Sequence, residues 1–369
     1  MRRPARAKRP KRQRQRLDDG ALIERLGGAL PQPTAQAVAR VTDLLARLKA
    51  AAGRSLKSFI HARSPLANLL GGIAEAAPYL WDLVQTDPAR LVHLLGSNPD
   101  TALAALLAKA KNAAVAAHAQ ADVQRILRHM KAEAALLIAL ADIGGVWPVV
   151  RVTGALTDVA DAALSAGVHF LLNEAAKRKK LTTPDRKNPE GGSGYIVLAM
   201  GKMGARELNF SSDIDLMVFF DTAAAKLAPD VEPAPFFVNL TRDLVKLLQE
   251  RTADGYVFRI DLRLRPDPSS TQIAISTEAA LDYYESRGQN WERAALIKAR
   301  ACAGDLAAGE RLLRHLAPFV WRKYLDYGTI ADVHEMKRQI HAYRGHGEIA
   351  IEGHNIKLGR GGIREIEFF

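Results

Sequence analysis

Asp213 and Asp215 stand two positions apart at the start of a short apolar run, Ile214–Phe220. A run of this length and composition is typical of a buried strand. Side chains two positions apart on a strand lie on the same face, so the two carboxylates converge on one point. Carboxylate oxygens are ligands that Mg²⁺ prefers. The sequence therefore predicts a magnesium site where this strand begins.

A third carboxylate, Asp261, lies in an alternating stretch, Tyr256–Leu264, that predicts another strand. The period of two places Asp261 on one strand face together with Arg259, Arg263 and Arg265. Three arginines around one acid are costly without anionic partners, and the guanidinium fork matches phosphate oxygens. We expect a phosphate site beside the metal. The expected catalytic residues and metal ligands are Asp213, Asp215 and Asp261.

A glycine-bounded turn, Gly201–Gly204, precedes the first two aspartates. Its glycines permit close backbone approach, and its lysine supplies a positive charge for a triphosphate or a phosphate ester. Two serines just before the strand offer hydroxyl donors. The expected phosphate and nucleotide contacts are Gly201, Lys202, Ser211, Ser212, Arg263 and Arg265.

These residues need a small sheet to hold them together. Apolar runs predict strands at 195–200 and 214–220, and helical spacing predicts a helix at 235–251 between the second strand and the alternating stretch. Earlier residues are rich in Ala and Leu at helical spacing, and residues from about Thr277 onward again favour helix. The fold class is α+β. The expected layout is a disordered basic tail at 1–16, a helical domain at 17–180, a linker at 181–194, a small mixed-sheet core at 195–275 and a helical segment at 276–369.

The net charge of +12 does not indicate a nucleic-acid-binding body. Nine of the 52 Lys and Arg fall in residues 1–16, which hold no acid, so 43 bases face the 40 acids of the remaining chain. We expect nonspecific contact by the tail with acidic surfaces or RNA, and no specific nucleic-acid partner.

The cellular location is predicted from cysteine usage and hydropathy. A single cysteine, Cys302, cannot form an internal disulfide, which favours a reducing cytoplasm. Acids interrupt the residues that follow the basic start, so no secretory signal is expected. The most apolar stretch, Ala134–Val150, contains an aspartate and helix breakers, so we expect no membrane span and no membrane partner.

The order of turn, Asp-x-Asp and later Asp resembles the nucleotidyltransferase superfamily that includes DNA polymerase beta, with Gly201-Lys202 in place of its Gly-Ser turn. Longer strings are similar to the N-terminal half of the bifunctional glutamine synthetase adenylyltransferase family. They are GKMGARELNFSSDIDL, RIDLRLRPDPSS, NWERAALIKARACAGD and NIKLGRGGIREIEFF. The resemblance covers about Leu17 to Phe369. It implies a polymerase-beta-like nucleotidyltransferase core at 195–275 and a truncation at the C-terminus.

The resemblance also implies a reaction, cofactors and partners. The stretch ELNFSSD at 207–213 and the N-terminal position resemble the half that removes adenylyl groups. That half uses Mg²⁺ and orthophosphate to phosphorolyse adenylyl-tyrosine on glutamine synthetase, which releases ADP, and the PII signalling protein is a further implied partner. Transfer of AMP from ATP would use the same carboxylates and stays open. So does a catalytically silent regulatory module that binds glutamine synthetase or PII.

Overall fold

The computed structural model describes residues 20–27, 30, 32–48, 51–62, 64–183, 185, 187–321, 334, 338, 352–357, 359–363 and 366. The chain forms two compact units. The first unit comprises Met1–Ala104 and Leu136–Pro148, and the second comprises Ala105–Ala135 and Val149–Phe369. The predicted helical domain at 17–180 therefore contributes helices to both units. The predicted tail at 1–16 lies outside the described residues.

The first unit is helical, with buried leucines along its helices. Its helices are α1 (Leu22–Arg25), α2 (Ala35–Arg47), α3 (Ala51–Ala62), α4 (Ser64–Ala76), α5 (Pro78–Thr86) and α6 (Pro88–Leu95). The Asp87 side chain caps α6 by accepting from the backbone N–H of Arg90 at 3.0 Å, and Pro88 occupies the first turn, where no N–H is needed. Leu22, Leu66 and Leu91 are fully buried, so α1, α4 and α6 each contribute an apolar face to the core of this unit.

The second unit combines helices with a mixed sheet. Its elements are α9 (Val149–Lys177), β1 (Tyr195–Ala199), α10 (Gly201–Gly204), β2 (Ile214–Phe220), α11 (Pro233–Gln249), β3 (Ile260–Asp261), β4 (Ile275–Ser276), α12 (Thr277–Ser286), α13 (Asn290–Leu296), β5 (Arg300–Gly304) and α14 (Leu306–Val320). The helices α7 (Pro99–Ala116) and α8 (Gln120–Ile143) contribute residues to both units. The predicted α+β class agrees with this content.

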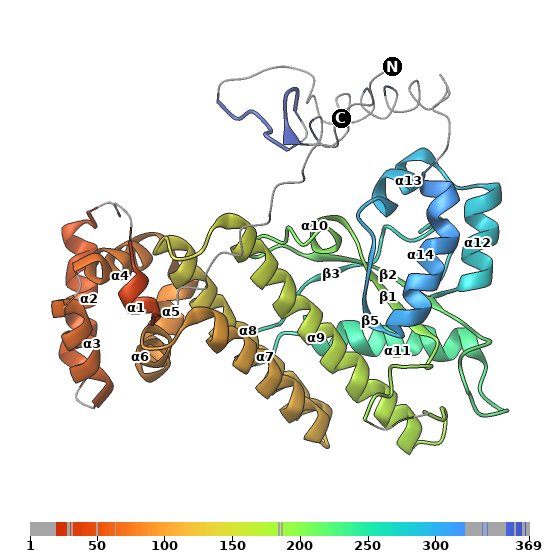
Figure 1. The fold of residues 1–369 in the computed structure, drawn as a ribbon, viewed down its shortest axis with the longest axis horizontal. Helices are drawn as coiled ribbons and strands as arrows, with labels where there is room; N and C mark the ends of the chain where they lie inside the picture. The colour runs from red at the N-terminus through yellow and green to blue at the C-terminus, as the bar shows by residue number, and fades with distance from the viewer. Residues whose placement is uncertain are drawn as a thin grey trace, which may run out of the picture. The chain divides into compact units, whose positions relative to one another are not determined.

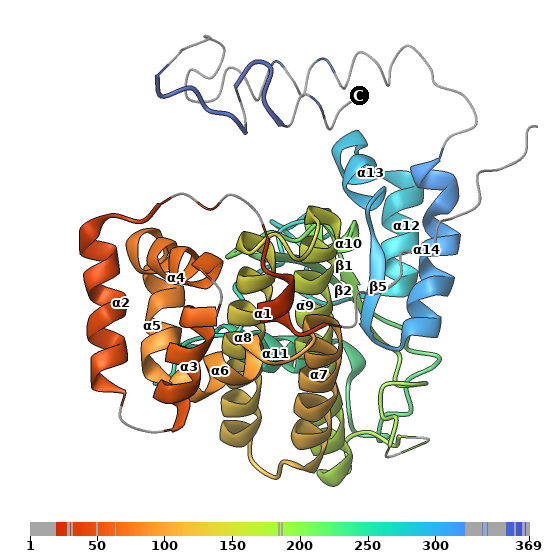
Figure 2. The same cartoon turned by 60° about the vertical axis from the view of Figure 1, so that its left-hand side comes forward.

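The sheet order is β3-β2-β1-β5, with β4 paired to β2 off this path. The strand β1 is antiparallel to both β2 and β5, whereas β3 and β4 run parallel to β2. In Figure 2 the strands β1, β2 and β5 stand between α9 on one side and α12 and α14 on the other. Because β1 is buried along its whole length, it reads as a continuous apolar run.

One face of the sheet packs against α11. Phe237 of α11 stacks on Tyr195 and Phe220, with ring centroids 5.9 and 4.8 Å apart. The Tyr195 hydroxyl lies 2.9 Å from the Thr241 hydroxyl, which itself donates to the Phe237 carbonyl. Figure 1 shows α11 and α9 on this side of the strands, opposite α12 and α14. The buried polar atoms are thus satisfied within an aromatic layer.

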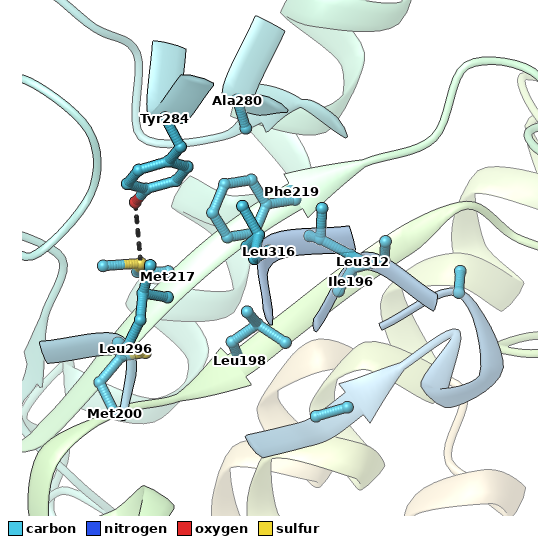
Figure 3. Packing of buried hydrophobic residues seen from close by; sticks show 12 residues of the cluster. Ile196, Leu198, Met200, Met217, Phe219, Ala280, Tyr284, Leu296, Leu312 and Leu316 are labelled. Carbon is cyan, nitrogen blue, oxygen red and sulfur yellow. Dashed lines mark hydrogen bonds between the residues drawn. The ribbon is translucent and has the colours of Figure 1, made fainter. Parts of the chain in front are cut away.

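The other face packs against α12, α13 and α14. Its buried cluster contains Ile196, Leu198, Met217 and Phe219 from the strands, and Tyr284 of α12 donates a hydrogen bond to the Met217 sulfur at 3.9 Å (Figure 3). Alternation along β2 places Asp215 on the same face as Met217 and Phe219. The candidate carboxylate therefore sits where this apolar layer ends.

Two predicted elements differ from the structure. The alternating stretch 256–264 forms a strand only at Ile260–Asp261, because the chain turns immediately afterwards. The helical segment predicted after Thr277 contains β5, which pairs with β1, so the sheet extends beyond the predicted core boundary at 275. The strand β5 carries Cys302, whose thiol donates to the Val197 carbonyl at 3.4 Å. Short apolar runs do not distinguish strand from helix without knowledge of the neighbouring strand.

The stretch predicted as a linker, 181–194, is packed into the second unit. The backbone N–H of Thr182 donates to the Lys226 carbonyl at 2.8 Å, and that of Gly192 donates to the Asp305 carboxylate at 3.0 Å. The side chain of Ser193 is buried. The described residues of this stretch therefore form a loop packed within the second unit, and composition alone cannot distinguish such a loop from a linker.

The helix α9 is long and apolar enough to cross a membrane by length and composition alone. In its most apolar window 72% of the residues are buried inside the structure. Core helices of globular proteins pass the same test, so this finding is weak evidence for a membrane span. The stretch that the sequence predicted to be most apolar, Ala134–Val150, lies almost entirely ahead of this helix.

Replacing Phe219 with alanine tests the core. Phe219 is fully buried between the strands and α12–α14, so the variant should lose about 3–5 kcal/mol of unfolding free energy. Leu306→Ala is the control, because Leu306 is 49% exposed, and its effect should be about 0.5 kcal/mol or less. Urea denaturation of both variants measures this difference. Similar losses would contradict the described packing.

Candidate active site

Asp215 and Asp261 are direct neighbours across the parallel strands β2 and β3. The register pairs Ile214 with Ile260 and Asp215 with Asp261. The backbone N–H of Ile214 also donates to the Arg259 carbonyl at 2.9 Å, which holds the two strand ends together. Adjacent strands lie about 4.8 Å apart, and paired residues project to the same face. The structure thus brings together two of the three predicted carboxylates.

Asp213 lies just ahead of β2 and is exposed, whereas Asp215 is half-buried. Burial and, after it, the negative charges of Asp261 and Asp213 together raise the pKa of Asp215 to about 6. Both neighbouring carboxylates therefore act electrostatically on Asp215. An excess of negative charge at a partly buried site favours a cation or a cationic ligand.

The glycine turn borders the Asp215 carboxylate as predicted. Gly201 has a φ of +52°, and a Cβ built on it would lie 3.0 Å from Oδ2 of Asp215. The backbone N–H of Met200 donates to the Asp215 carbonyl at 2.9 Å. A side chain at Gly201 would therefore be strained and would press on the carboxylate.

The other predicted phosphate contacts of this region surround the aspartates without binding them. Lys202 is exposed on α10, and Ser211 is exposed with a φ of +56°. The Ser211 carbonyl accepts a hydrogen bond from the Arg259 guanidinium at 2.8 Å, which holds this turn against β3. Ser212 is half-buried beside Asp213. The lysine and the serine hydroxyls thus lie on the segments that lead into the carboxylates.

Arg263 binds Asp261 in this structure. Its Nε lies 2.9 Å from Oδ2 and 3.0 Å from Oδ1 of Asp261, and its backbone N–H donates to Oδ1 at 2.8 Å. These hydrogen bonds, together with the Arg263 charge, hold the pKa of Asp261 below its ordinary value. Within the described residues no group of three Asp, Glu, His or Cys side chains has the geometry of a metal centre. Arg263 must leave Asp261 before that carboxylate can ligate a metal.

Arg265 does not have the position predicted for it. Its Nη1 and Nη2 donate to the carbonyls of Leu262 and Pro268 at 2.8 Å each, and its Nε donates to that of Thr271 at 3.3 Å. Each guanidinium nitrogen donates one hydrogen bond to the loop after β3. Arg265 therefore stabilises this loop, and its contact with phosphate stays a prediction. The short β3 also means that Arg259, Asp261, Arg263 and Arg265 do not share one strand face.

Two residues support the site from elements outside its aspartate and glycine motifs. The side-chain oxygen of Gln249 accepts from the backbone N–H of Ile260 at 2.9 Å and so anchors β3 to the end of α11. Arg300, which lies in the string NWERAALIKARACAGD, donates from β5 to the Met203 carbonyl of α10 at 3.3 Å. Sequence reasoning missed Gln249, which carries no local sequence signal.

A mixed sheet with paired aspartates beside a glycine turn is the arrangement expected of a nucleotidyltransferase. The family model for glutamate-ammonia ligase adenylyltransferase matches residues 67–315. The chain belongs to this family of nucleotidyltransferases. A second family model, for PII-uridylyltransferase, matches residues 332–369, most of which lie outside the described residues.

Curated relatives agree with the family. The chain is 66% identical over 302 residues to a protein of Bradyrhizobium diazoefficiens, which covers 82% of this chain and 30% of the relative. It is 55% identical over 354 residues to a protein of Rhodopseudomonas palustris, with 96% of this chain and 36% of the relative covered. Both relatives are named bifunctional glutamine synthetase adenylyltransferase/adenylyl-removing enzyme. The chain spans about a third of the length of these relatives.

The raised pKa of Asp215 predicts a pH-dependent cost to stability. A carboxyl whose pKa is higher in the folded state binds its proton more tightly there, so unfolding free energy falls as pH rises from about 4 through 6. Asp215→Asn should therefore gain about 1–2 kcal/mol at pH 7, after allowance for solvent screening, and almost nothing below pH 4.

Asp261→Asn provides the opposite control in the same assay. The pKa of Asp261 is lowered, so its contribution is present above pH 4 and lost as pH falls further. This variant should be destabilised at pH 7. Urea denaturation between pH 3.5 and 7.5 without divalent metals gives both curves. A gain from Asp215→Asn that is independent of pH would contradict the electrostatic coupling.

The two arginines after Asp261 should differ in their effects on stability. Arg265→Ala removes three bonds to loop carbonyls and should cost about 2–3 kcal/mol of unfolding free energy. Arg263→Ala should cost clearly less than Arg265→Ala, because the Arg263 side chain is 83% exposed and its ion pair is screened by solvent. Thermal and urea unfolding compare the variants. Equal costs would argue against a structural role that is specific to Arg265.

Proposed function

We propose that the chain removes AMP from adenylyl-tyrosine of glutamine synthetase by phosphorolysis, as one part of a longer bifunctional enzyme. An oxygen of orthophosphate attacks the α-phosphorus, and the bond from that phosphorus to the tyrosyl oxygen breaks. The products are ADP and tyrosine, whose hydroxyl takes up a proton. The observation that carries the proposal is the pairing of Asp215 with Asp261 on parallel strands, with Asp213 two residues before.

The donor chemistry suits Mg²⁺, with Asp213, Asp215 and Asp261 as its ligands. Burial and the two neighbouring acids, Asp261 and Asp213, raise the pKa of Asp215 to about 6. A bound cation would relieve this accumulation of negative charge. Two Mg²⁺ bound there would supply charge neutralisation for the two anions and for the leaving oxygen. Once released from Asp261, the exposed Arg263 is free to bind phosphate oxygens.

Other side chains orient the anions. Lys202 on α10 neutralises phosphate oxygens beside the Gly201 backbone, and the hydroxyls of Ser211 and Ser212 donate from the turn before β2. Such pre-positioned donors stabilise charge in the transition state without reorganising. Positioning of the two anions in line for displacement supplies most of the remaining rate enhancement in phosphoryl transfer.

The direction of the reaction rests on the stretch 207–213, whose sequence ELNFSSD is similar to the adenylyl-removing half of the family. The names of the relatives contain both adenylyl transfer and adenylyl removal, so the names alone do not favour one direction. Binding of glutamine synthetase as the protein substrate follows from the same proposal, as does a site for ADP. Control by a PII protein is part of the same proposal, as a feature of the family.

The test incubates the 369-residue chain with adenylylated glutamine synthetase, Mg²⁺ and orthophosphate, and measures ADP release. Asp213→Asn and Asp261→Asn should each lower the rate at least about 100-fold, because each removes a charged ligand at the site of displacement. Asp230→Asn is the control, since Asp230 is exposed on the loop before α11. Chelation of Mg²⁺ should abolish ADP release by the wild type.

Other outcomes separate the alternatives. Incorporation of AMP from ATP into glutamine synthetase, without release of ADP, would replace removal with transfer. Absence of both activities in a folded chain, with glutamine synthetase still bound, would favour a regulatory module. ADP release that survives in both aspartate variants would overturn the assignment of the catalytic residues.

A further inference from the structure

The turn α10 borders Asp215 but is too short to be stable by itself. It is one helical turn, closed by the bonds from the N–H of Gly204 to the Met200 carbonyl at 3.0 Å and from the N–H of Ala205 to the Gly201 carbonyl at 3.1 Å. The turn ends at Gly204, and Arg206, two residues later, has a φ of +62°. An isolated turn forms one or two hydrogen bonds at a high cost in backbone entropy. Its position must therefore come from tertiary contacts.

Two arginines connect this turn to α9. Arg206, directly after the turn, forms an ion pair with Asp158 and approaches Asp161, with Nη1 3.7 Å from Oδ2. Arg300 of β5 donates from Nη2 to Oδ1 of Asp161 at 3.0 Å and to the Met203 carbonyl of α10 at 3.3 Å. The guanidinium groups thus bind the turn, the strand and the helix at once.

The two acids occupy adjacent turns of one helix face. Asp158 and Asp161 are three residues apart on α9, so their side chains project together. Their side chains are 34% and 23% exposed, so these ion pairs are less screened than fully exposed ones. Burial raises the pKa of Asp161, while Arg300 and Arg206 oppose that rise. Loss of Asp161 would remove the ion-pair partner of Arg300, and loss of Asp158 would leave Arg206 with only its 3.7 Å approach to Asp161.

The opposite side of the turn is closed by backbone. A Cβ built on Gly204 would lie 2.0 Å from the Lys298 carbonyl oxygen and 2.6 Å from that of Ala199. The Lys298 ammonium lies 3.6 Å from the Glu207 carboxylate, just beyond the turn. The turn therefore sits between the backbone before β5 and the acids of α9, with little space in which to move.

We propose that Asp158 and Asp161 are positioning residues that act through Arg206 and Arg300 to hold α10, and with it Gly201 and Lys202, against Asp215. The phosphate-binding part of this inference rests on the proposed function. The acids do not reach the reacting groups. They belong to α9, a helix that carries none of the catalytic motifs, and nothing in its local sequence marks them as functional.

Amide hydrogen exchange tests the position of the turn without requiring activity. Asp161→Asn should speed exchange of the amides in 200–207 about tenfold, and exchange in α11 should stay unchanged. Asp158→Asn and Arg206→Gln should act similarly. The double variant of Asp158 and Arg206 should be no faster than Arg206→Gln alone, because the loss of Arg206 already removes its ion pair with Asp158. Glu174→Gln is the matched control on α9, since Glu174 pairs only with Lys177 among the ion pairs of the described residues.

Steady-state kinetics with orthophosphate as the varied substrate provides the second readout. In Asp161→Asn the KM for orthophosphate should rise about tenfold, with a smaller change in kcat, because Lys202 loses its position. Unchanged exchange at 200–207, or acceleration spread evenly over the whole sheet, would overturn the proposal. If the wild type released no ADP, the proposed function would fail, and local acceleration at 200–207 would still establish the clamp on the turn.

Discussion

The pairing of β2 with β3 is the constraint on which the site depends. Their parallel register places Asp215 beside Asp261 at a point where the sheet emerges from its apolar core. Two like charges at this separation repel each other, and partial burial increases the cost of ionising Asp215. The sheet tolerates this cost because its hydrophobic layers on both faces stabilise the strands. Clustering the two carboxylates therefore costs stability at this position.

The neighbouring structure reduces that cost in different ways. Arg263 neutralises Asp261 directly, whereas Gly201 leaves room for the Asp215 carboxylate by having no side chain. Arg265 does not contribute charge to the aspartates but closes the loop that carries Arg263. Two arginines of one motif, only two residues apart, thus have unlike roles. The difference arises from the end of β3, after which alternation of side chains no longer applies.

The site is also supported by elements that carry neither its aspartates nor its glycine turn. The strand β5 extends the sheet next to β1, and its Arg300 contacts both α9 and α10. The helix α9 is apolar and most of its apolar window is buried, yet its Asp158 and Asp161 pair with Arg206 just after the glycine turn. A compact catalytic sheet of few strands depends on such surrounding helices, because a short strand such as β3 forms few hydrogen bonds of its own.

The sequence alone determined the strands β1 and β2, the helix α11 and the grouping of the aspartates near a glycine turn. Those predictions succeeded because apolar runs of strand length, helical periodicity and Asp-x-Asp spacing are local patterns. The length of β3, the strand character of 300–304 and the role of Arg265 were decided only by tertiary structure. The first two depend on a partner distant in the chain, a parallel neighbour or an adjacent strand. Arg265 binds carbonyls within six residues of itself, in a loop whose path has no periodic sequence pattern. The same is true of the acids on α9, whose relation to Arg206 and Arg300 exists only after the helix packs beside the sheet.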